Sequence, residues 1–172
     1  IRDYTHLRYV ATDGEEGVPS PQTSVLYPQA GYCIVRDRWP PPGQARDAFH
    51  LVFRCGYRSR YHRHDDDLNL VLYCGGEDWL IDSGIYRYAE QDPLRLYMRS
   101  KWAHNVPVVH RPAAKRWTWE APHAVLPLKR LPAQADGVVA VRGITHTYPG
   151  HVAMRDLHVN APAREFTVTD SL

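Results

Sequence analysis

The sequence predicts an all-β protein, an antiparallel β-sandwich, and three observations favour this fold. Short apolar runs that alternate with polar residues recur along the chain, turn residues separate them, and no long segment has the periodicity of a helix. Strands at this spacing are typical of a sandwich or a barrel. A length of 172 residues suits one domain over 1–172 with a core of its own.

The first part of the chain contains one weak and two stronger strand patterns. Tyr4 to Val10 is predicted as a weak strand, and residues 12–24, rich in Gly, Pro and Ser, as a loop. Gly31 to Trp39 and Ala48 to Cys55 are predicted strands with a proline-rich loop between them. The second of these alternates apolar residues on one face, which indicates a half-buried strand.

The middle of the chain carries the strongest hairpin signal. Leu68 to Tyr73 and Asp78 to Asp82 flank a turn that contains Gly75-Gly76. Pro93 to Lys101 is predicted as a helical turn, because proline suits the first helical position. The later predicted strands are Val106 to Val109, Arg116 to Glu120, Val125 to Leu131, Val138 to His146, His151 to Val159 and Glu165 to Val168.

Composition excludes several classes of function. Hydrophobic residues make up 44% and charged residues 23% of the chain, and no window approaches 18 uninterrupted apolar residues, so no membrane span is expected. The net charge of +2 is too small to indicate nucleic acid. The three cysteines lack CxxC spacing, which favours buried free thiols, although one pair could bridge. Because the chain begins with Ile1, we expect a piece of a longer protein.

The densest group of chemically active side chains is His62-Arg63-His64-Asp65-Asp66-Asp67. If the segment before Leu68 is extended, His62 and His64 point to the same side, because side chains alternate along a strand. Two converging imidazoles are a common start of a divalent-metal site. The alternative is a solvated polar turn. Nearby basic residues could attract an anionic ligand.

A carboxylate and a third imidazole complete the candidate site. Asp82 ends a predicted strand before Gly84, and antiparallel pairing brings it back towards Asp67 and Leu68, within reach of His64. The alternative role for Asp82 is to cap the turn. His104 follows farther along the chain. Two histidines, one aspartate and an open position suit zinc.

Four blocks in this order resemble one family of enzymes. They are Tyr27-Pro28-Gln29-Ala30-Gly31-Tyr32, His62-Arg63-His64 with Asp67, Asp82-Ser83-Gly84-Ile85-Tyr86, and Arg99-Ser100-Lys101-Trp102-Ala103-His104-Asn105. Together they resemble the C-terminal β-domain of heparinase II/III-like polysaccharide lyases, strongly from Tyr27 to Val109 and weakly to the end. The resemblance implies a supersandwich-like β-domain that packs against an N-terminal helical toroid, which this chain does not contain.

The resemblance also implies roles for individual residues. His64, Asp82 and His104 would be the metal ligands, with zinc as the metal. His62 and Tyr86 would be the catalytic residues that face the substrate, and Arg60, Arg99 and Asn105 would bind it. Asp65 and Asp66, which stand between His64 and Asp67, depart from the family pattern.

The implied reaction is β-elimination at a uronic acid in an acidic polysaccharide. The carboxylate at C6 must be neutralised, a base must remove the C5 proton, and an acid must protonate the departing O4. Zinc would shape the cleft wall, because elimination needs no activated water. The resemblance implies a periplasmic or secreted protein, and little or no activity for this chain by itself.

Two alternatives remain on the sequence. Gly56 followed by His62-x-His64 matches the opening of the first cupin motif, which indicates a metal-dependent oxygenase or isomerase, but the expected glutamate and the second motif are missing. The other alternative is a sandwich that binds carbohydrate without catalysis. Trp117 and Trp119 would share one face of a strand, although such pairs more often pack in a core.

Overall fold

The structure is a computed structural model that describes residues 4–56, 63–109, 128–133, 137–148 and 150–172. Its elements are α1 (Thr5–Ala11), β1 (Ser24–Tyr27), β2 (Tyr32–Arg36), a 3-10 turn (Ala45–Asp47), β3 (Phe49–Arg54), β4 (Asn69–Cys74), β5 (Glu77–Leu80), α2 (Pro93–Met98), a 3-10 turn (Lys101–Ala103), β6 (Leu128–Arg130), β7 (Val138–Tyr148), β8 (His151–Asn160) and β9 (Glu165–Ser171).

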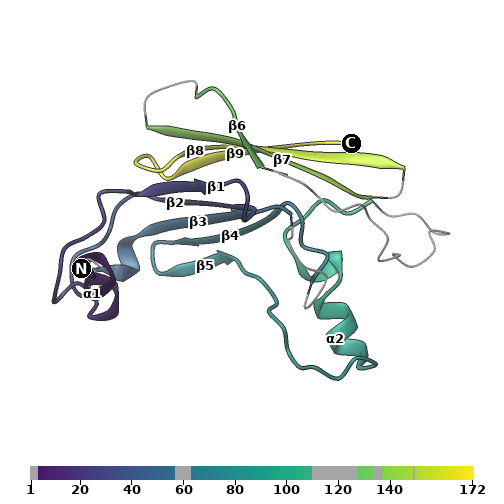
Figure 1. The fold of residues 1–172 in the computed structure, drawn as a ribbon, viewed down its shortest axis with the longest axis horizontal. Coiled ribbons are helices and arrows are strands. Elements are labelled where there is room, and N and C mark those ends of the chain that lie inside the picture. Colours follow the sequence, from purple (N-terminus) through teal and green to yellow (C-terminus); the bar gives the residue numbers. More distant parts are fainter. Residues whose placement is uncertain (1–3, 57–62, 110–127, 134–136, 149) are drawn as a thin grey trace.

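The strands form two antiparallel sheets that lie face to face (Figure 1). The first sheet has the order β1-β2-β3-β4-β5, and the second has the order β6-β7-β8-β9. Each strand pairs with its neighbour in the sequence, so both sheets are meanders. The predicted antiparallel β-sandwich is confirmed.

The core lies between the sheets. In β3, Phe49, Leu51 and Phe53 are at most 1% exposed, which confirms the alternation read from the sequence. They belong to one cluster with buried side chains of the second sheet, including Leu157 and Val159 of β8. Burial of such a cluster supplies most of the driving force for folding.

Gly143 of β7 marks a point where the sheets approach closely. A Cβ atom at this position would lie 2.7 Å from Leu68 Cδ2 and 2.7 Å from Phe53 Cζ. Protein interiors are close-packed, so only glycine fits here without displacement of its neighbours.

Glycine residues with positive φ form turns between neighbouring strands of the first sheet. Gly75 and Gly76 both adopt positive φ and join β4 to β5, which confirms the predicted hairpin. Gly31 joins β1 to β2 with φ +77°, and its Cβ would lie 2.2 Å from the Cys55 carbonyl oxygen. The strand β1 begins at Ser24, the last residue of the predicted loop, and was not expected.

Two predicted strands are wrong. Residues Tyr4 to Val10 lie largely in the helix α1, and no residue of α1 is buried. The alternation of apolar and polar residues in this segment therefore does not correspond to a buried face. A short helix closes its own backbone hydrogen bonds and needs no partner strand. Val106 to Val109 has no strand pairing, because Pro107 lacks an N–H group and its carbonyl accepts from the Tyr148 hydroxyl.

The remaining predicted elements agree with the structure where it describes them. The helical turn begins at Pro93, and the Asp92 side chain caps it by accepting from the N–H groups of Leu94 and Arg95. All three cysteines are free thiols, and Cys33 and Cys55 are buried. The predicted strand Arg116 to Glu120, with Trp117 and Trp119, lies outside the described residues. No helix of the described part is long and apolar enough to cross a membrane.

Candidate metal centre

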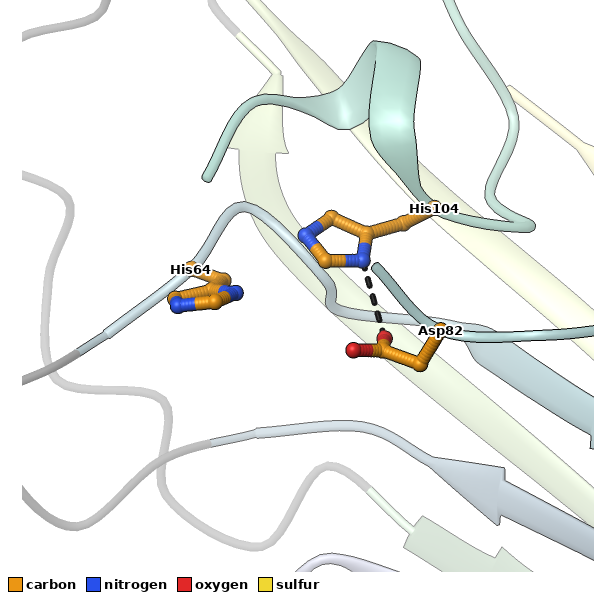
Figure 2. Close-up of side chains that lie close together, drawn as sticks. All are labelled: His64, Asp82 and His104. Carbon is orange, nitrogen blue, oxygen red and sulfur yellow. Dashed lines mark hydrogen bonds and ion pairs between the residues drawn. The ribbon is translucent and has the colours of Figure 1, made fainter. Parts of the chain in front are cut away.

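Three side chains from separate segments converge at one end of the first sheet (Figure 2). His64 precedes β4, Asp82 follows β5, and His104 ends the 3-10 turn Lys101–Ala103. One ligand atom from each lies within 4.8 Å of the other two. The structure therefore brings together the three residues that the sequence predicted as metal ligands.

The hairpin explains how His64 and Asp82 meet. Strands β4 and β5 pair antiparallel, with Leu72 opposite Leu80 and an irregularity between Leu72 and Tyr73. This register returns the chain to the start of β4, so that the Asn69 amide donates to Asp82 Oδ2 at 2.7 Å. The sequence predicted the meeting but not the contribution of Asn69.

Leu68 turns the chain from His64 into β4. It is fully buried and has φ 74°, a left-handed conformation that is costly for a branched residue, on the order of 1–3 kcal/mol. Arg155 of β8 donates to the Leu68 carbonyl at 2.7 Å and to the Asn105 carbonyl at 2.7 Å, while a bidentate pair with Asp170 holds its guanidinium. The second sheet thus fixes two segments of the site.

Asp82 and His104 form the closest pair in the cluster. The His104 Nδ1 atom lies 2.9 Å from Asp82 Oδ2, and the Gly84 N–H donates to Asp82 Oδ1 at 2.9 Å. The hydrogen bond to His104 lowers the pKa of Asp82 to about 2, so the carboxylate is ionised at neutral pH. The predicted turn-capping role of Asp82 also exists, since it accepts from Gly84.

The two imidazoles lie side by side, and His64 has the protonation state that a metal requires. The rings of His64 and His104 lie 5.4 Å apart between centroids. Burial and, to a lesser degree, the neighbouring His104 lower the pKa of His64 to about 4, so His64 is neutral at pH 7. The His104 side chain is fully buried, and its Nε2 atom has no hydrogen-bond partner among the described residues. Such an orphaned nitrogen fits a metal ligand.

The aspartates after His64 have separate roles. Asp67 is 2% exposed and accepts hydrogen bonds from the Gly56 N–H, the Arg63 guanidinium and the Thr145 hydroxyl. Asp66 pairs with Arg54. Asp67 is therefore a structural anchor between the sheets, which the run of three aspartates in the sequence did not reveal.

Two predicted substrate-binding residues hold the site together in this structure. Arg99 donates twice to the Arg63 carbonyl, at 3.0 and 2.7 Å, directly before His64. The Asn105 amide donates to the Leu70 and Ile81 carbonyls, each at 2.8 Å, and its N–H donates to the Asn69 side chain at 2.8 Å. Their contact with a substrate stays a prediction.

Of the two predicted catalytic residues, the structure describes Tyr86 but not His62. Tyr86 is 50% exposed, lies in the loop after Gly84 and adopts φ 55°. Arg87 lies over its ring at 5.0 Å. His62 and Arg60 lie outside the described residues.

Comparison with known proteins gives one consistent family. The family model described as heparinase II/III-like, C-terminal, matches residues 19–172. A heparin-sulfate lyase from Bacteroides stercoris is 28% identical over 102 residues, which cover 58% of this chain and 15% of that protein.

Solved structures show the same fold. A heparinase III structure has a TM-score of 0.74 and 20% identity over 98% of this chain and 25% of its own. The heparan sulfate lyase HepC from Pedobacter heparinus has a TM-score of 0.70 and 18% identity, over 96% of this chain and 24% of its own. The chain thus spans about a quarter or less of the length of these relatives.

Proposed function

Because this chain belongs to the heparinase II/III-like, C-terminal family, we propose that it is the β-sandwich part of a polysaccharide lyase. The enzyme cleaves uronic-acid-containing polysaccharide by β-elimination. The observation that carries the proposal is the convergence of His64, Asp82 and His104 within a chain of this family. The resemblance read from four sequence blocks is confirmed, and it favours the lyase over the cupin alternative.

The three side chains suit zinc. Two imidazoles and one carboxylate are ligands that zinc prefers, and a fourth position stays available. The buried His104 Nε2 atom without a partner among the described residues supports this assignment. When bound, zinc would fix the cleft wall by linking the segments before β4, after β5 and after α2.

We assign the elimination to His62 and Tyr86. A base removes the C5 proton, its electron pair forms the C4–C5 double bond, the C4–O4 bond breaks, and an acid protonates O4. His62 and Tyr86 are the proposed acid and base. The exposed position of Tyr86 on a loop next to Asp82 supports access to a polymer.

Neutralisation of the substrate carboxylate requires positive or donor groups. We propose Arg60, Arg99 and Asn105 for this task. Both amide hydrogens of Asn105 are used by the Leu70 and Ile81 carbonyls, so a substrate contact by this amide requires one of these bonds to open.

The rest of the enzyme is proposed from its relatives. Since the chain covers about a quarter of the heparinase III structure, we propose that a helical domain of the same protein packs against the sandwich and completes the cleft. We also propose that the protein acts on acidic polysaccharide in the periplasm or outside the cell.

Metal content tests the centre. We expect near-stoichiometric zinc in the purified chain, loss of the zinc in His64→Ala, and retention in His146→Ala, whose histidine is exposed on β7. Equal zinc in all three proteins, or none in the folded wild type, would contradict the metal assignment.

Product formation tests the reaction. The full-length protein should generate an ultraviolet-absorbing C4–C5 double bond from a uronic-acid polymer, and His62→Ala and Tyr86→Phe should reduce the rate. Binding of the polymer without this product would favour the non-catalytic carbohydrate-binding alternative.

A further inference from the structure

A hollow of about 290 Å³ lies at the end of the first sheet opposite the metal centre. Arg36, His50 and Tyr73 line it, and they are cross-strand neighbours on β2, β3 and β4. Tyr9 of α1 and Trp39 lie in the same lining. Figure 1 shows α1 and α2 at opposite ends of the molecule.

The strands place polar groups in the hollow because alternate residues face opposite sides. Val35, Phe49 and Leu72 are buried in the core, so the neighbouring Arg36, His50 and Tyr73 face away from it. The hollow therefore lies on the outer face of the first sheet, and the metal centre lies beyond the other ends of these strands.

Arg36 gives the hollow a positive charge that no ion pair among the described residues neutralises. Among the described residues, no carboxylate pairs with Arg36, whose guanidinium lies 4.4 Å from the centre of the Trp39 ring. Burial and the charge of Arg36 lower the pKa of His50 to about 4, and its buried Nε2 atom has no partner in the described part of the chain. Asp13 also lines the hollow, but it is exposed. A half-buried cation without a carboxylate partner favours an anionic ligand, and the unpartnered His50 nitrogen leaves a polar contact for it.

The aromatic walls of the hollow are held in place before any ligand binds. The Trp39 indole N–H donates to the Gln22 carbonyl at 2.9 Å. The Tyr9 hydroxyl donates to the Pro40 carbonyl at 2.7 Å and so attaches α1 to the loop after β2. The Tyr73 hydroxyl donates to the Arg46 carbonyl at 3.4 Å. Fixed walls lower the entropic cost of binding.

We propose that this hollow is a second carbohydrate site, which binds an acidic sugar residue of a polysaccharide at a distance from the metal centre. Arg36 binds the carboxylate or sulfate group of the sugar, and the rings of Trp39 and Tyr9 contact its apolar face. The volume, near the lower end of the roughly 300–1,000 Å³ of small-molecule sites, suits one or two sugar rings. The choice of an acidic polysaccharide rests on the proposed function.

Calorimetric titration of the purified chain with a heparosan tetrasaccharide, in buffer that contains a metal chelator, tests the proposal. We expect Arg36→Met to weaken binding by about tenfold to a hundredfold, as for loss of a charged hydrogen-bond partner. Arg130→Met, which removes an exposed arginine on β6, should leave the affinity unchanged. Equal affinity of both variants would overturn the proposal.

Two further ligands define what the hollow recognises. Cellotetraose, which is neutral, should bind more weakly than the acidic tetrasaccharide. Sodium sulfate, which has charge but no sugar ring, should also bind more weakly than the tetrasaccharide. Equal binding of sulfate and tetrasaccharide would overturn the sugar assignment and leave a simple anion site. The Trp39 indole N–H signal in NMR spectra, assigned with Trp39→Phe, should shift with the tetrasaccharide, and an unmoved signal at saturation would locate the ligand elsewhere.

The same experiments separate this proposal from the lyase proposal. His64→Ala should abolish zinc binding and leave the tetrasaccharide affinity of the hollow intact. Loss of tetrasaccharide binding in His64→Ala but not in Arg36→Met would overturn the second site. Binding that depends on Arg36 in a protein without elimination activity would refute only the lyase assignment.

Discussion

Substitution of Asn69 by alanine tests how the protein supports its candidate metal centre. Asn69 is 3% exposed and makes two side-chain contacts: its amide donates to Asp82 Oδ2 at 2.7 Å, and its carbonyl oxygen accepts from the Asn105 N–H at 2.8 Å. The first bond orients a predicted ligand, and the second holds the residue that follows His104. One substitution therefore loosens two of the three ligands.

The expected loss of stability follows from these two bonds. A hydrogen bond to a charged group contributes about 1.5–3 kcal/mol, and an N–H left without a partner costs about 1–3 kcal/mol when it is buried. Because the Asp82 side chain is 34% exposed, water replaces part of the first contribution. We expect Asn69→Ala to lower the free energy of unfolding by about 2–4 kcal/mol.

Urea unfolding of the metal-free chain measures this change, and zinc titration measures its effect on the site. Loss of a group that orients a metal ligand by a hydrogen bond typically lowers the metal affinity by about 10–100-fold. Asn160→Ala is the matched control, because within the described part of the chain the Asn160 side chain accepts a single long hydrogen bond, of 3.4 Å, from the exposed Ala163 N–H. If both variants lose the same stability and bind zinc equally well, Asn69 does not support the site.

Three other changes probe the site and the core. The pKa values of His64, about 4, and Asp82, about 2, lie below those of about 6.5 and 3.9 in an unfolded chain, so the folded state binds fewer protons and loses stability as the pH falls from 6.5 towards 2. Urea unfolding of metal-free protein should show a smaller loss of unfolding free energy between pH 6.5 and 4 in His64→Gln than in the wild type. Parallel curves of unfolding free energy against pH would contradict the lowered pKa of His64. Asp67→Asn should cost about 3–5 kcal/mol, because Asp67 is a buried partner of a buried guanidinium, whereas Asp156→Asn in a partly exposed pair should cost under about 1 kcal/mol. Gly143→Ala should lower the melting temperature, through an overpacking cost of about 1–3 kcal/mol, and an unchanged temperature would refute the close contact of the sheets.

The sequence predicted the parts of the fold that local pattern controls. The alternation of Phe49, Leu51 and Phe53 and the turn at Gly75-Gly76 placed β3, β4 and β5, because a buried face and a tight turn each leave a short-range signature. The same reasoning failed for α1. A helix without buried residues has no face for periodicity to report.

The candidate site divides in the same way. Hairpin pairing predicted that Asp82 returns to His64, since antiparallel register follows from the turn. The position of His104 depended on the family resemblance, because 22 residues separate it from Asp82 and no local rule fixes such a contact. The sequence by itself determined which residue types were available as ligands and which two would meet.

Only the tertiary structure decided which polar groups support those ligands. Arg155 acts through contacts across the sandwich, and Asn69 acts through contacts with the segments that follow β5 and the second 3-10 turn. Asp67 is a buried anchor between the sheets, whereas Asp66 pairs with Arg54. These roles depend on how segments distant in the sequence pack together. A hydrogen bond has a direction and a length within a few tenths of an ångström, so only packing in three dimensions determines which of several similar side chains can form it.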